Sequence, residues 1–206
     1  MSPLPCRVNF YLIRPIRAWV LSVAIGLIGQ WPLSVYSAQT LDPLPQVLVV
    51  HQDAVFNVTA HYDIPVNQTT AWSVLTDFDH FPLFLHNVQS VHVLNHSNDR
   101  YRIEETGEAQ WGIISMSYQN VREITVYPER LITSHTLSGT VKSMQTRMEV
   151  SSHGANQVSL DYHATIEPDS WLASLFGTDF IESEVKEQFQ SMAQEMIKRQ
   201  NQSTIN

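Results

Sequence analysis

The chain carries two kinds of hydrophobic periodicity, one after the other. Between residues 55 and 166, apolar and polar residues alternate in runs separated by prolines and turn residues. The last run is the clearest, because Val158, Leu160 and Tyr162 are apolar and their neighbours are polar. A period of two indicates strands with one buried face. Seven strands are predicted: Val55–Ile64, Val88–Leu94, Tyr101–Trp111, Ile113–Tyr127, Leu131–Leu137, Val141–Val150 and Val158–Ile166.

Three helices are predicted around these strands. Asn67 can cap a short helix that runs through Thr76, and a second short helical segment follows around Asp79–Leu85. After the last strand the period becomes 3.6, which is typical of an amphipathic helix. This helix is expected to begin near Thr178 and to give way to a polar tail at Asn201. Its apolar face carries Ile181, Val185, Phe189, Met192 and Met196.

The order of these elements predicts an α+β fold. An extended lead-in over residues 38–53 precedes one strand, two short helices, six strands and a long helix. Regularly spaced strands joined by tight turns favour an antiparallel sheet. Only the C-terminal helix is large enough to cover the apolar face of that sheet. We therefore expect a curved antiparallel sheet of about seven strands wrapped on the C-terminal helix.

Residues 1–37 are predicted to be a secretory signal peptide. Three arginines and no acidic residue occur there, and the apolar run Ala18–Ile28 is followed by small residues. This pattern predicts cleavage after Ser37 or Ala38 and export, with the bacterial periplasm as the expected location. The alternative is an uncleaved membrane anchor, although the apolar run is shorter than the roughly 20 residues that span a bilayer.

The acidic composition excludes some function classes. The chain has 12 Lys and Arg residues against 20 Asp and Glu residues, and without residues 1–37 the formal charge changes from −8 to −11. Nucleic-acid binders need a basic contact face, so we expect no nucleic-acid partner. The acidic surplus also disfavours electrostatic docking to anionic lipid. Because Cys6 is the one cysteine, the mature domain is expected to have no thiol for catalysis or metal binding.

Several motifs resemble one superfamily. They are Ile64–Val66, Ala71–Phe78, Phe81–Leu85, Tyr127–Arg130 and Leu137–Gly139. With the element order, they resemble the START-like (SRPBCC) helix-grip superfamily, which includes START lipid-transfer domains, Bet v 1 allergens and the polyketide cyclase/dehydrase group. The likeness is closest to the coenzyme Q-binding branch and covers residues 54–200. His86 stands where members often carry a proline.

The resemblance implies a hydrophobic cavity between the sheet and the C-terminal helix. Most members bind a lipid, sterol, quinone or polyketide there, and only some are enzymes. Flexible methionine side chains suit such a cavity, although they are equally compatible with ordinary core packing. Eight residues are candidates for ligand contact: Trp72, Phe84, Met116, Tyr118, His135, Met144, Met148 and Phe189.

His135 is the most polar of these candidates. It alternates with Leu131, Thr133 and Leu137, on a face expected to point inward, where Tyr118, Glu105 or Arg122 are candidate partners. It is a candidate anchor for a ligand headgroup or an acid–base group of an enzyme. A half-buried histidine with a structural partner is the alternative.

Other chemistry has little support in the sequence. His92 and His96 lie on a strand and its turn, where a spacing of four does not bring side chains together. Neither a Gly-x-Ser-x-Gly motif nor a phosphate-binding loop occurs. We predict no metal, no cofactor and no catalytic residue.

Three functions are therefore considered. The first is an exported carrier or sensor of an apolar small molecule of the lipid or quinone class. The second is a cyclase or dehydratase that uses His135 and Tyr118, and the third is a protein-interaction domain with a filled cavity. In a carrier, the ligand is expected to enter between the second short helix and Trp171–Phe176. This apolar cluster is expected to be a lid or a transient membrane contact, with core packing as the alternative.

Overall fold

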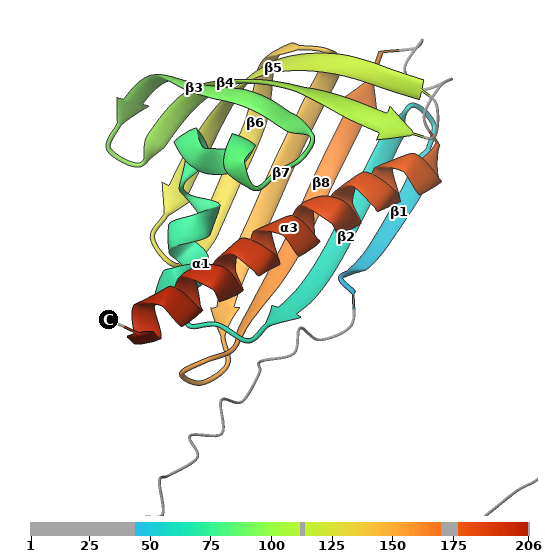
Figure 1. Cartoon of the computed structure of the whole chain (residues 1–206). Coiled ribbons are helices and arrows are strands. Elements are labelled where there is room, and N and C mark those ends of the chain that lie inside the picture. The colour runs from blue at the N-terminus through green and yellow to red at the C-terminus, as the bar shows by residue number, and fades with distance from the viewer. Residues whose placement is uncertain (1–43, 112–113, 170–176, 206) are drawn as a thin grey trace, which may run out of the picture. The chain divides into compact units, whose positions relative to one another are not determined.

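The protein is built on one curved antiparallel sheet. The computed structural model describes residues 44–111, 114–169 and 177–205, all within one unit, Ala38–Asn206. Eight strands pair in the order β1-β2-β8-β7-β6-β5-β4-β3 (Figure 1). The strands are β1 (Gln46–Gln52), β2 (Val55–Ile64), β3 (Val88–Ser97), β4 (Arg100–Trp111), β5 (Ile114–Tyr127), β6 (Leu131–Gly139), β7 (Val141–Ser152) and β8 (Val158–Pro168).

The helices lie on the concave face of this sheet. They are α1 (Gln68–Leu75), the 3-10 helix η1 (Phe78–Leu83) and the long helix α3 (Thr178–Ile205). Figure 1 shows α3 crossing the concave face diagonally, and α3 contacts β1, β2 and α1. The α+β helix-grip architecture predicted from the sequence is confirmed.

The expected lead-in forms an additional strand. Residues 46–52 pair with β2 at every position, from Gln46 opposite His61 to Gln52 opposite Val55. The sheet therefore has eight strands, not seven. The cause of the difference is the unbroken apolar run Val47–Val50, which lacks the alternation used to identify the other strands.

Local interactions explain the two short helices. The side chain of Asn67 caps α1 by accepting a hydrogen bond from the Thr70 N–H at 2.7 Å. Pro82 lies inside η1, where Phe78 and Phe81 are buried. Both helices occur where the sequence predicted them.

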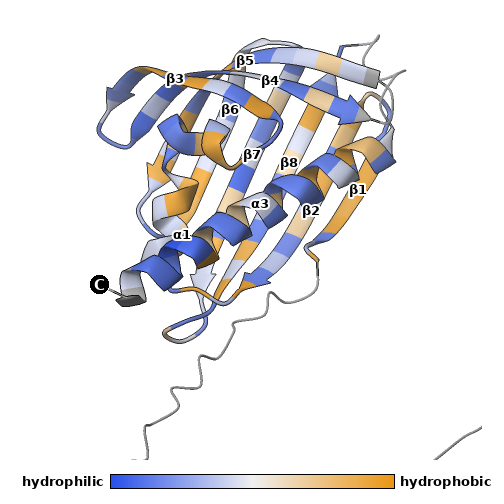
Figure 2. Ribbon diagram, viewed as in Figure 1, coloured by the Kyte–Doolittle hydropathy of each residue, from blue (hydrophilic) through white to orange (hydrophobic). Residues whose placement is uncertain are grey.

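The C-terminal helix packs through the predicted stripe. Phe189, Met192 and Met196 are buried, while the face of α3 turned away from the sheet is largely hydrophilic (Figure 2). The helix continues to Ile205, through the polar segment expected to lie outside it from residue 201. Gln200, near this end, accepts a hydrogen bond from the Asn67 N–H at 3.3 Å. No helix in the described ranges is long and apolar enough to cross a membrane.

Two leucines on opposite faces of the sheet test this packing. Leu160 in β8 is 0% exposed, whereas Leu48 in β1 is 61% exposed. Leu160→Ala should lower the free energy of unfolding by about 2–5 kcal/mol, because it leaves a cavity in the core. Leu48→Ala should change it by less than about 0.5 kcal/mol. Urea unfolding of the two variants measures both values, and equal losses would contradict this account of the core.

Candidate ligand cavity

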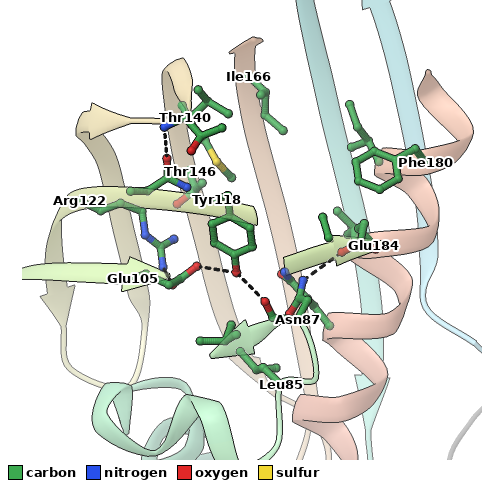
Figure 3. A pocket seen from close by; sticks show the side chains of 18 of the residues that line it. Leu85, Asn87, Glu105, Tyr118, Arg122, Thr140, Thr146, Ile166, Phe180 and Glu184 are labelled. Atoms are coloured by element: carbon green, nitrogen blue, oxygen red, sulfur yellow. Dashed lines mark hydrogen bonds and ion pairs between the residues drawn. The ribbon is translucent and has the colours of Figure 1, made fainter. Parts of the chain in front are cut away.

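A cavity of about 320 Å³ lies between the concave face of the sheet and the first half of α3 (Figure 3). Strands β4, β5, β7 and β8, the segment between η1 and β3, and α3 contribute to its wall. Most of this wall is apolar. Representative side chains are Leu85, Val88, Ile166, Phe180, Val185 and Met192.

Five of the eight candidate residues lie on the cavity wall. They are Met116, Tyr118, Met144, Met148 and Phe189. Trp72 and Phe84 do not line it and instead pack, partly buried, against the hydrophobic core. The Phe84 ring lies 5.9 Å from the Arg199 guanidinium carbon. For the five lining residues, contact with a ligand stays a prediction.

His135 does not point into the cavity, so the inward orientation expected for it is wrong. Its side chain is exposed, whereas the buried Ser134 beside it bonds Thr146 on the inner face at 2.7 Å. Pairing passes from Val121 opposite Ser138 to Arg122 opposite Thr136. This bulge lies beyond His135. Between residues 131 and 136 the alternation is unbroken, and Ile132 and Ser134 pair with Met148 and Thr146, which line the cavity, so His135 faces outward.

Glu105 and Arg122 form an ion pair on the inner face of β4 and β5. The Arg122 Nη2 donates to Glu105 Oε2 at 2.5 Å. The Arg122 side chain is 19% exposed and the Glu105 side chain 11%. The Arg122 Nε is buried and has no partner among the described residues. These two residues were proposed as partners of His135, but they pair with each other.

Tyr118 extends the ion pair toward β3. Its hydroxyl lies 3.2 Å from Glu105 Oε1 and 3.1 Å from the Asn87 carbonyl, to either of which it can donate its proton. The ring lies over Gly107, its partner on β4. A Cβ at residue 107 would lie 2.0 Å from the Asn87 carbonyl oxygen and 2.5 Å from the Tyr118 ring. Only glycine therefore allows this close approach.

Asn87 connects this group to the helix. Its Nδ2 donates to Glu184 Oε2 at 3.0 Å. Figure 3 shows the resulting line of polar groups from Arg122 through Glu105, Tyr118 and Asn87 to Glu184. We call these five residues the polar line. It joins β5 to α3 along a wall that is mostly apolar.

Burial shifts the titration of the hydroxyl and carboxyl groups here. It raises the pKa of Tyr118 far above its usual range, and the charge of Glu105 adds to this effect. Burial raises the pKa of Tyr162 to about 12, and burial also raises the pKa of Glu184. Both tyrosines therefore keep their protons at neutral pH and can donate hydrogen bonds.

Two glutamates, two tyrosines and one arginine are the titratable side chains that line the cavity in the described part of the chain. Histidine, cysteine, serine and lysine are absent from the described lining, so glutamate and tyrosine are the acid–base groups that it presents. The described residues also contain no group of three or more side chains that could hold a metal ion. Trp171–Phe176, expected near the opening, lies outside the described residues.

The family follows from the sequence match. Residues 64–193 match the model of the family described as polyketide cyclase / dehydrase and lipid transport. The chain belongs to this family. No curated protein matches the chain in sequence.

Solved structures share the fold of this polyketide cyclase/lipid transport family member at low identity. A protein of Thermus thermophilus has a TM-score of 0.61 and 13% identity, covering 69% of this chain and 98% of its own. An aromatase/cyclase of Streptomyces sp. R1128 has a TM-score of 0.59 and 11% identity, and the match covers 73% of this chain and 96% of the aromatase/cyclase. A STAR-related lipid transfer protein of Xanthomonas axonopodis has a TM-score of 0.57 and 11% identity, and the match covers 75% of this chain and 94% of that structure. These likenesses confirm the START-like fold.

Tyr162, Asn87 and Glu184 are three of the polar residues on the family member's cavity wall that sequence reasoning missed. Tyr162 was assigned only to an apolar strand face, and Asn87 precedes the predicted strand without any local signal. Glu184 had a usable signal, because it lies three residues after Ile181 and beside Val185 on the stripe of the helix. A carboxylate on an apolar helix face is uncommon unless it has a partner.

Two glutamates on the same pair of strands test the ion pair. Glu105→Ala should cost about 3–5 kcal/mol of unfolding free energy, because it leaves the Arg122 charge unpaired and buried. On the outer face, Glu123 lies 3.6 Å from Arg102, and their side chains are 27% and 50% exposed. Glu123→Ala should therefore cost less than about 1 kcal/mol. Similar losses in urea unfolding would contradict the assignment of Glu105 as the partner that matters.

Proposed function

We propose that this protein is an exported carrier of an apolar small molecule of the lipid or quinone class, held in the cavity without chemical change. The observation that carries the proposal is the cavity itself. Its volume of about 320 Å³ lies within the range of roughly 300–1,000 Å³ typical of small-molecule sites. Burial of the ligand's apolar surface, at about 25 cal/mol per Å², would supply the affinity.

The side chains of the wall support a binding role. Met116, Met144, Met148 and Met192 all line the cavity. Unbranched thioether side chains adapt to irregular apolar shapes, because they rotate about three bonds. Phe189 packs edge-to-face on Tyr162 at 5.6 Å between ring centroids, which gives the opposite wall a fixed surface. A wall of this kind favours a carrier whose cavity accommodates the shape of its ligand.

An enzyme of the cyclase or dehydratase kind is the second candidate. The aromatase/cyclase with the same fold supports it, as does the buried group formed by Glu105, Tyr118 and Arg122. Two observations favour the carrier. His135, the proposed acid–base residue, is exposed, and the raised pKa of Tyr118 makes its hydroxyl a poor proton donor in a reaction at neutral pH.

A protein-interaction domain with a filled cavity has less support. Such a domain would occupy the space between sheet and helix with its own side chains, as ordinary protein interiors do. Here the space of about 320 Å³ remains open in the described part of the chain. The carrier proposal explains this space, while the interaction proposal does not.

Substitutions on α3 test the carrier proposal. Native mass spectrometry of the gently extracted full chain should show a bound apolar molecule. Val185→Trp should abolish that extra mass, because residue 185 lines the cavity. Ser183→Trp should retain it, because residue 183 is exposed on the same helix. An empty wild-type protein that binds neither lipid nor quinone analogues would overturn the proposal.

Export is tested at the N-terminus. Residues 1–37 combine three arginines, an apolar run and small residues before Ala38, the pattern of a cleaved signal. The mature protein isolated from expressing bacterial cells should therefore begin at Ala38 or Gln39. Ile25→Arg, which interrupts the apolar run, should leave the precursor uncleaved. A wild-type protein that begins at Met1 would contradict cleavage.

A further inference from the structure

The charges on the cavity wall restrict which apolar molecules can bind. In the described part of the chain, three lining residues are of types that ordinarily carry a charge at neutral pH: Glu105, Arg122 and Glu184. One is a cation and two are carboxylates. The wall therefore carries an excess of negative charge, although its remaining surface is uncharged.

The one cation on the wall of the described cavity is already paired. Arg122 donates to Glu105 at 2.5 Å, and both side chains are largely buried. A ligand carboxylate or phosphate that bound the free Nε of Arg122 would lie beside Glu105, so that one buried cation would face two buried anions. A second buried anion without a cation of its own is strongly unfavourable. Arg122 is therefore a poor anchor for an anionic ligand.

The second carboxylate has no cation to compensate it. Glu184 accepts a hydrogen bond from the neutral Asn87 amide at 3.0 Å, and the described residues place no ion-pair partner beside it. Burial, followed by the charge of Glu187, raises its pKa. A ligand anion would add to the unfavourable charge in this part of the cavity.

Uncharged hydrogen-bonding groups remain available on the same wall. Tyr162 and Gln188 both line the cavity, and the polar side-chain atoms of neither bond another described residue. A hydroxyl or amide donor can satisfy a ligand hydroxyl or carbonyl without bringing a charge into the cavity. The described wall thus offers partners for a neutral oxygen, whereas the charge of its one cation, Arg122, is already balanced by Glu105.

We infer that the cavity selects an uncharged apolar molecule with a hydroxyl or carbonyl oxygen and rejects the corresponding carboxylate. The inference rests on the proposed carrier function and narrows its ligand class. It assigns Glu184 a role in specificity, because this side chain disfavours the wrong ligand rather than attracting the right one.

A matched pair of ligands tests the inference. Nile red, an uncharged apolar dye, is bound to the full chain at pH 8 and displaced by 1-dodecanol or by dodecanoate, which share their chain length and differ in charge. Dodecanol should displace the dye at a concentration at least about tenfold lower, a ratio that corresponds to about 1.4 kcal/mol. Equal displacement, or a preference for dodecanoate, would overturn the selectivity and leave the carrier function standing.

Two variants locate the selectivity on the helix. Glu184→Gln removes the charge and keeps an oxygen that can accept from Asn87, so it should improve dodecanoate binding at least about threefold with dodecanol unchanged. Glu123→Gln removes the same charge from the outer face of β5, beside Arg102, and should leave the ratio unchanged. An unaltered ratio in Glu184→Gln would overturn the role of that residue. Failure of Nile red and of both ligands to bind would instead overturn the carrier function itself.

Discussion

The width of the sheet is the constraint on which the rest of the structure depends. Eight strands spaced about 4.8 Å apart make a sheet about 35 Å wide, whereas a helix with its side chains is about 10 Å across. One helix cannot cover a flat sheet of this width. The sheet therefore curves, α1 and η1 cover part of the concave face, and α3 crosses it diagonally. The space that α3 leaves over the inner face of β4, β5, β7 and β8 is the cavity. In this fold the cavity arises from the number of strands and the single long helix, and the side chains decide only its size and polarity.

The polar line determines how that space differs from an ordinary apolar core. Glu105 and Arg122 satisfy each other, and Asn87 joins the strand side of the cavity to Glu184 on the helix. Buried polar groups are tolerated when they have partners of this kind. The line also holds the first half of α3 against the segment that follows η1, so the wall that surrounds a ligand is fixed on both sides. Stability and specificity consequently depend on the same few side chains.

The sequence contained most of the fold but only part of the site. Alternation predicted seven strands, and a period of 3.6 predicted α3, because burial of one face imposes these periods directly. The strand β1 was missed because its apolar run does not alternate. His135 was placed on the wrong face because the apolar residues Leu131 and Leu137 were taken to mark the inner side of β6, whereas Ile132 and Ser134 pair with the lining residues of β7. Met116, Met144 and Met148 were named because flexible thioethers suit the cavity that the family resemblance implies, whereas Asn87 and Glu184 meet only through the tertiary approach of α3 to the segment before β3.

At the polar end of the cavity, the residue that position 107 can hold depends on Tyr118 and on the backbone at Asn87. The Tyr118 ring occupies the space that a side chain at residue 107 would fill, and the Asn87 carbonyl closes it from the other side. A larger residue at position 107 is therefore compatible with this backbone only after position 118 has become smaller and the segment at residue 87 has moved. Mutational routes that enlarge or reshape this end of the cavity must follow that order. The apolar end, walled by flexible methionines, carries no such restriction, so adaptation of the cavity to new molecules is expected to begin there.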